Sequence, residues 1–152
     1  MREAVIVSYA RTGLAKSGRG GFNMTPTMSM GAHAVKHAVE RSGIDASEIE
    51  DCIMGNVSHG AGNLGRQVAL LAGMPITTSG STVNRFCSSG SQSIAMAANM
   101  IVNEGAEVAI GAGVDFALQI VQVGLAGGAV GMHFGVGGDG YFEIRNRVQP
   151  GH

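Results

Sequence analysis

Four short apolar segments alternate with three segments of helical periodicity, and this alternation restricts the fold more than any other feature of the chain. The apolar segments are rich in Val and Ile, as buried strands are, and cover residues 3–10, 51–57, 80–86 and 106–113. The helical segments cover residues 29–43, 62–73 and 88–102. Gly43 and Gly73 close the first two, at the position where glycine often ends a helix. The pattern predicts an α/β domain of order β-α-β-α-β-α-β with a mostly parallel sheet.

The third helical segment differs from the others because it carries no charge. The first charged residue after residue 88 is Glu104. A helix without a charged face is typical of the interior of a protein, so we expect this helix to be buried on all sides. Cys87 then lies at the junction between the third strand and a buried helix.

The composition indicates a chain that buries part of its surface against another molecule. Charged residues make up 14% and hydrophobic residues 45% of the 152 positions, whereas a typical soluble domain has about 25% charged residues. We therefore expect a homo-oligomer. A net charge of −1, an aromatic content of 5% and the absence of Trp argue against a nucleic-acid partner.

Neither a targeting segment nor a metal site is evident. The start, MREAVIVSYART, has no basic region followed by an apolar core and a cleavage site, so we expect a cytoplasmic protein. Cys52 and Cys87 lie in different predicted elements without metal-ligand spacing, and Cys52 has the apolar surroundings of a buried structural cysteine. His33 and His37 are four residues apart on a helix, a spacing that suits two metal ligands. Because no third ligand accompanies them, we expect a partly solvated helix face and no bound metal.

The character of the chain changes after residue 115. Residues 116–138 contain no Asp, Glu, Lys or Arg and are rich in Gly. The segment is long enough to cross a membrane, but Gln119, Gln122, His133 and the glycines weaken its hydrophobicity and its helix preference. We expect a buried strand with a glycine loop, or an interface, and no membrane partner. The predicted organisation is a domain over residues 1–115 and a divergent Gly-rich tail over residues 116–152.

A glycine motif in the second helical segment has the outline of a dinucleotide-binding fingerprint. Residues 60–65 read GAGNLG, which fits G-x-G-x-x-G. The fingerprint also needs an acidic residue about 20 positions later, and the next acidic residue is Glu104. We therefore expect no nucleotide cofactor.

Cys87 has the position of a nucleophile. The partial positive charge at a helix N-terminus lowers the pKa of a nearby thiol, and the thiolate is the reactive form. The backbone N–H groups of the strand-to-helix turn could also stabilise a developing oxyanion. The alternative is an inert cysteine that fills space in the core, which is common.

The residues around Cys87 resemble a known family. VNRFCSSGSQSIAMAA is similar to the acylation motif of the thiolases, V-N-x-x-C-x-S-G. REAVIVSYARTGLAKSGRGGF, IEDCIMGNVSHGAGNLGRQVALLAGMP and GAEVAIGAGVDFALQIVQ also resemble thiolase segments, so the likeness extends from Arg2 to Gln122. Asp115 and Phe116 stand where the family usually has Glu and Ser.

This resemblance implies a thiolase-like fold and an acyltransferase of fatty acid metabolism. Thiolases cleave 3-oxoacyl-CoA or condense acetyl-CoA through an acyl-cysteine, which is covalent nucleophilic catalysis. It implies Cys87 as the catalytic residue, with Ser88, Ser89 and Gly90 forming the helix start that supports it. The substrate would be an acyl-CoA thioester with no separate cofactor, and the assembly a homodimer or homotetramer.

The chain also departs from the thiolase pattern. The family activates its cysteine with the His of a G-H-P motif and uses a second cysteine in C-x-G and the Asn of N-E-A-F, and this sequence has none of the three. A complete thiolase has a second, similar half and a loop domain. GMHFGVGGDGYFEI resembles the Gly-rich closing turn of thiolases, and in that alignment His133 takes the place of the second cysteine. The alternative for His133 is an ordinary polar residue.

Two other functions therefore stay open. The chain could be a non-catalytic thiolase-fold remnant or subunit that lacks the acid and base partners. It could also be a related condensing enzyme such as a ketoacyl synthase, although the two downstream histidines of that class are missing and VNRFCSSG fits thiolases better.

Overall fold

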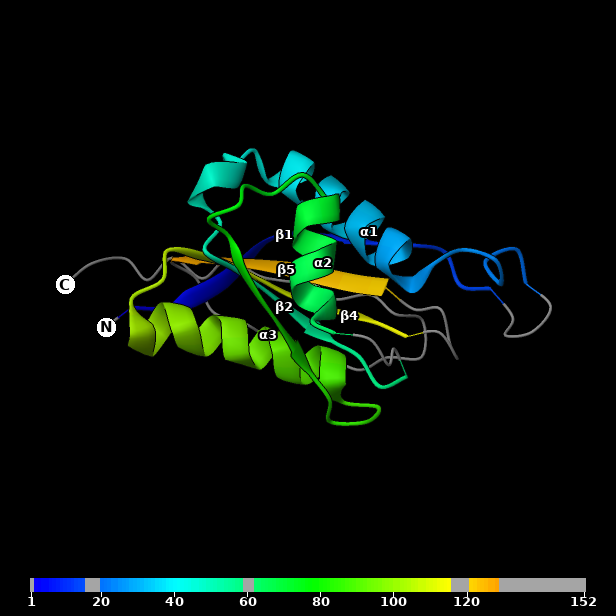
Figure 1. Ribbon diagram of the computed structural model, residues 1–152. Coiled ribbons are helices and arrows are strands. Elements are labelled where there is room, and N and C mark those ends of the chain that lie inside the picture. The colour runs from blue at the N-terminus through cyan, green and yellow to red at the C-terminus, as the bar shows by residue number, and fades with distance from the viewer. Residues whose placement is uncertain (1, 16–19, 59–61, 116–120, 129–152) are drawn as a thin grey trace.

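The computed structural model describes residues 2–15, 20–58, 62–115 and 121–128. Five strands and three α-helices make up this part of the chain (Figure 1). In chain order they are β1 (Ala4–Arg11), α1 (Thr27–Ser42), β2 (Asp51–Gly55), α2 (Leu64–Leu71), β3 (Ser79–Val83), α3 (Ser89–Asn99), β4 (Val108–Val114) and β5 (Val121–Gly128). A short 3-10 helix η1 (Ala46–Glu48) precedes β2, and α3 continues into a π-helical turn η2 (Met100–Glu104).

The strands form a single sheet in the order β1-β5-β4-β2-β3. Strand β2 pairs in parallel with β3 and with β4, whereas β5 pairs antiparallel with β4 and with β1. Four strands therefore point the same way and β5 points the opposite way, which confirms the predicted α/β class with a mostly parallel sheet. Strand β5 belongs to the uncharged segment for which a strand was one of the expected structures. The division of the chain at residue 115 stays a prediction.

Helices cover both faces of the sheet, with α1 and α2 on one face and α3 on the other (Figure 1). Along β2, Cys52 and Met54 point into the core that α1 and α2 cover, while Ile53 points to the α3 face and packs with Ala97. The alternation follows from the two-residue period of a strand. Because helices cover both faces of the sheet, both faces of β2 are apolar, as is typical of a strand inside an α/β sheet.

Glycines allow α3 to approach the sheet closely. A Cβ at Gly55 would lie 2.4 Å from the backbone carbonyl of Ser89, and a Cβ at Gly111 would lie 2.5 Å from the Cα of Ile94. Gly113 lies under Gly90, where an added Cβ would be 3.0 Å from that residue's Cα. The first two turns of α3 thus rest directly on the backbone of β2 and β4, and this contact fixes the height of the helix start above the sheet.

The third helix is present as predicted, but the expected burial on all sides is not met. Its buried residues are Ser89, Ser93 and Ala97, which lie on one face. Met96 is 36% exposed on the remaining surface. The reason is that α3 packs on one sheet, and no further layer lies over it within the described part of the chain. The absence of charge on this helix therefore leaves an uncharged surface rather than a buried one.

Within the described residues, no helix is both long enough and apolar enough to cross a membrane.

The substitution Gly111→Ala tests the close contact between α3 and β4. The added methyl would collide with the backbone of α3, so we expect the free energy of unfolding to fall by about 1–3 kcal/mol. Gly21→Ala is the control, because no atom lies within 4 Å of a Cβ there. Urea unfolding of both variants measures the difference, and equal stabilities would contradict the proposed contact.

Candidate active site

The site lies at one edge of the sheet, where three parallel strands end together. Because β2, β3 and β4 run parallel, their carboxyl ends meet at the same edge, which is where open α/β sheets bind ligands. Residues 56–58 follow β2, residues 84–88 follow β3, and Asp115 follows β4. Cys87 belongs to the second of these segments and is exposed. The sequence-based placement of Cys87 between a strand and a helix is confirmed.

The turn that carries Cys87 has an unusual backbone. Phe86 has φ of 50°, and no other non-glycine residue in the described part of the chain has a positive φ. This left-handed conformation is unfavourable for a bulky side chain and persists only where the surroundings enforce it. The Phe86 side chain is 77% exposed, so its burial does not compensate for the strain. Hydrogen bonds within the turn hold this strained conformation in place instead.

Ser89 and Asn84 supply the side-chain hydrogen bonds of this turn. The Ser89 hydroxyl accepts from the N–H of Arg85 (2.8 Å) and donates to the carbonyl of Phe86 (2.6 Å). The Asn84 side-chain oxygen accepts from the N–H of Phe86 (3.0 Å), a bond that spans two residues as in an Asx turn. These bonds hold the N–H and the carbonyl of Phe86, the residue immediately before Cys87.

The start of α3 provides no carboxylate close to Cys87. Ser88 is the N-cap residue, and its hydroxyl donates to the carbonyl of Arg85 (3.0 Å) instead of capping the helix. The first turn contains no acidic residue. The partial positive charge of the helix N-terminus is therefore not offset by a side chain of that turn, and Cys87 lies beside an uncompensated helix start.

The backbone donors expected to hold an oxyanion are partly in use. The N–H of Ser88 donates to the carbonyl of Arg85 (3.3 Å), and the N–H of Ser89 donates to the carbonyl of Phe86 (3.0 Å). An oxyanion bound to Cys87 would therefore need another donor, such as the N–H of Cys87 itself. Its stabilisation by this turn stays a prediction.

Asn56 joins the ends of the three strands and was not identified from the sequence. Its N–H donates to the carbonyl of Val83 (3.0 Å) at the end of β3, and its side-chain amide donates to the carbonyl of Val114 (2.5 Å) at the end of β4. The side chain is 4% exposed. Asn56 and Asn84 each come directly after a strand, and this shared position is a signal that the sequence does contain.

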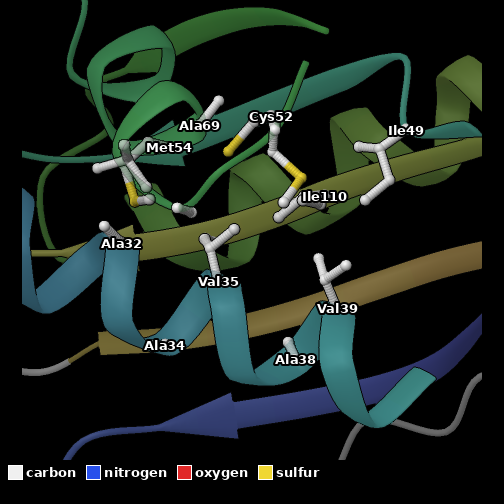
Figure 2. Close-up of a cluster of buried hydrophobic side chains, with 14 of the residues drawn as sticks. Ala32, Ala34, Val35, Ala38, Val39, Ile49, Cys52, Met54, Ala69 and Ile110 are labelled. Atoms are coloured by element: carbon white, nitrogen blue, oxygen red, sulfur yellow. The ribbon is translucent and has the colours of Figure 1, made fainter. Parts of the chain in front are cut away.

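Cys52 has the opposite environment to Cys87. It has no exposed surface and lies among side chains of α1, α2 and β4 (Figure 2). Burial, together with the negative charge of Asp51, raises the pKa of the Cys52 thiol to about 12. The prediction of a buried structural cysteine is confirmed.

The two described histidines lie on α1, which covers the face of the sheet opposite α3. His33 and His37 are on α1, with ring centroids 4.4 Å apart, and the Nδ1 atom of His37 lies 3.1 Å from a carboxylate oxygen of Glu40. His33 is exposed and His37 is half-buried, as expected for a partly solvated helix face. No group of three or more His, Cys, Asp or Glu side chains in the described ranges has the arrangement of a metal site. The predicted position of His133 lies outside the described residues.

Known proteins resemble this chain in sequence, including the segment around Cys87, and in fold. Residues 4–117 match the family described as Thiolase, N-terminal domain. The 3-ketoacyl-CoA thiolase of Bacillus subtilis is 39% identical over 127 residues, which are 82% of this chain and 32% of that protein. The acetyl-CoA acetyltransferase of Cupriavidus necator is 38% identical over 115 residues, which are 74% of this chain and 29% of that protein.

A solved structure shows the same arrangement of elements. The crystal structure of the Bacillus anthracis acetyl-CoA acetyltransferase superposes with a TM-score of 0.71 at 31% sequence identity, covering 74% of this chain and 29% of that one. The chain belongs to the thiolase family. It spans about a third of the length of the curated relatives it matches.

The two cysteines should differ sharply in reactivity. In native protein at about pH 8 we expect iodoacetamide to modify Cys87 and to leave Cys52 unmodified. With a pKa of about 12, only ~1 in 10⁴ Cys52 thiols is ionised at that pH, and the side chain is also inaccessible. Peptide mapping by mass spectrometry identifies the modified residue. Cys87→Ser should abolish native labelling, whereas equal labelling of both cysteines in folded wild type would contradict this assignment.

Proposed function

We propose that the chain carries out thiolase-type acyl transfer on acyl-CoA, with Cys87 as the acyl acceptor. The observation that carries this proposal is the position of Cys87: an exposed cysteine in a strained strand-to-helix turn, at the start of a helix without acidic residues in its first turn. The names of the relatives, 3-ketoacyl-CoA thiolase and acetyl-CoA acetyltransferase, supply the substrate class.

In the proposed step, the thiolate of Cys87 attacks the carbonyl carbon of the acyl-CoA thioester. A carbon–sulfur bond forms to Cys87, and the carbonyl electrons move onto oxygen. When the tetrahedral intermediate collapses, the bond to the coenzyme A sulfur breaks. Coenzyme A leaves as a thiolate that takes up a proton, and the acyl group stays on Cys87. The helix start contributes by placing partial positive charge beside the attacking sulfur.

The second half of the reaction needs groups that this chain does not supply in the usual motifs. Cleavage or condensation requires a proton to move at the α-carbon of the substrate. The sequence has no G-H-P histidine and no cysteine after Cys87. This observation favours a second candidate, a thiolase-fold subunit or remnant that does not turn over alone.

We also propose a homo-oligomer. Strand β3 is an edge strand, and it carries no Lys, Pro or acidic residue that would discourage pairing with another chain. Leu71 is 56% exposed and Ile76 is 83% exposed on the segment that leads into this strand. Together with the low content of charged residues, these features support a surface that another copy of the chain covers.

Incubation with acetyl-CoA separates the two candidate functions. We expect intact mass spectrometry to show the addition of one acetyl group to the wild type and none to Cys87→Ala, because the acyl group is carried on that sulfur. Cys52→Ala is the matched control and should still be acetylated. A folded wild type without an adduct would favour the non-catalytic subunit.

A further inference from the structure

Asp115 binds the loop that follows β2. One of its carboxylate oxygens accepts from the N–H of Val57 (3.1 Å), and the other accepts from the hydroxyl of Ser58. Hydrogen bonds to an ionised acceptor are stronger than those between neutral groups. Both residues are therefore held by the residue that directly follows β4, which lies more than fifty positions later in the chain.

The loop that Asp115 holds is joined in turn to the segment before Cys87. The carbonyl of Val57 accepts from the side-chain amide of Asn84 (3.4 Å), and the Asn84 oxygen accepts from the N–H of Phe86 (3.0 Å). The hydrogen bonds thus run from Asp115 through the backbone N–H and carbonyl of Val57 and through the side chain of Asn84 to Phe86, the residue before Cys87. Next to Val57, Asn56 joins the ends of β2, β3 and β4 through its own hydrogen bonds.

The strained backbone of Phe86 makes this connection important. A left-handed phenylalanine relaxes to a negative φ unless several contacts oppose it. Asn84 provides one of these contacts, and the orientation of Asn84 depends on Val57. If the loop moved, Asn84 would lose its bond to Val57, and one of the contacts that oppose the relaxation of Phe86 would weaken while those of Ser89 remained.

We propose that Asp115 is a positioning residue for Cys87: by clamping Val57 and Ser58 with two oxygens, it holds the turn in the conformation that presents the thiol at the helix start. The inference rests on the proposed function, because it assumes that Cys87 is the acyl acceptor. The structural link between Asp115 and Cys87 is argued from hydrogen bonds. Asp115 acts through Val57 and Asn84 and is not assigned a direct role in the reaction.

The test is the rate at which iodoacetamide alkylates Cys87 in Asp115→Asn, measured between about pH 6 and pH 10 by peptide mapping. An amide offers one acceptor oxygen and places a donor against the other partner. We expect alkylation at neutral pH to be about five- to tenfold slower, because the thiol spends less time at the helix start. If Asp115 acted only through its negative charge, replacing it by a neutral side chain would not slow alkylation. Unchanged or faster alkylation therefore overturns the proposal.

Two further variants distinguish positioning from general damage. Asp115→Glu keeps both acceptor oxygens and should retain more than half of the wild-type rate. Asp45→Asn is the matched control, because the Asp45 carboxylate also accepts from a backbone N–H (2.8 Å) and from a hydroxyl (2.7 Å), both of Ser47. Asp45 precedes η1 at the amino end of β2, on the opposite edge of the sheet from Cys87. Equal slowing in Asp45→Asn overturns the proposal.

A smaller change covers the case in which Asp115→Asn does not fold. Ser58→Ala removes the hydroxyl that binds Asp115, and Ser47→Ala removes the corresponding hydroxyl at Asp45. Ser58→Ala should slow alkylation about twofold, and Ser47→Ala should not. An unchanged rate in Ser58→Ala overturns the proposal.

Acetylation by acetyl-CoA is measured separately on the same variants. A wild type that is alkylated but not acetylated would refute acyl transfer, while the ratio of alkylation rates would still decide whether Asp115 positions Cys87.

Discussion

The contact between the start of α3 and the backbone of β2 and β4 determines where the thiol of Cys87 lies. Gly55 and Gly113 occupy positions on the sheet where any side chain would push the helix outward. Opposite them the helix also carries small residues, Ser89 and Gly90. Because a helix start is a local source of positive potential, a displacement of this contact moves both the potential and the cysteine. The position of Cys87 therefore depends on residues that lie beneath the helix, on the sheet.

The two cysteines of this chain lie in opposite environments, one buried and one exposed. Cys52 lies on the face of β2 that α1 and α2 cover, where burial keeps its thiol protonated. Cys87 lies past the end of the neighbouring strand, where the sheet stops and solvent begins. Sequence patterns distinguish these environments, because Cys52 is followed by the apolar strand residues Ile53 and Met54, whereas Cys87 is followed by two serines and a glycine.

Sequence reasoning predicted the order and type of the elements because the hydrophobic periods are clear and glycine ends the first two helices. Gly43, for example, is the left-handed C-terminal cap of α1, with φ of 70°. The predicted second and third strands ran two or three residues too far. Val57 and Phe86 have side chains typical of strands, but the Asn before each forms hydrogen bonds that take its segment out of the sheet. The links from Asp115 to residues 57 and 58 join distant parts of the chain, and no local pattern indicates them.

The antiparallel strand β5 has a consequence for the sequence separation of the strand pairings. Among the described strands, β5 lies between β1 and β4 and joins β1 to the rest of the sheet. The register places Ala4 opposite Gly128, so the first described strand pairs with the last described residues. The strand also contacts α1, where the Ser8 hydroxyl donates to the carbonyl of Ala38 (2.7 Å). Because pairings of such long sequence separation form slowly, we expect the parallel strands β2, β3 and β4 to associate before β1 is secured.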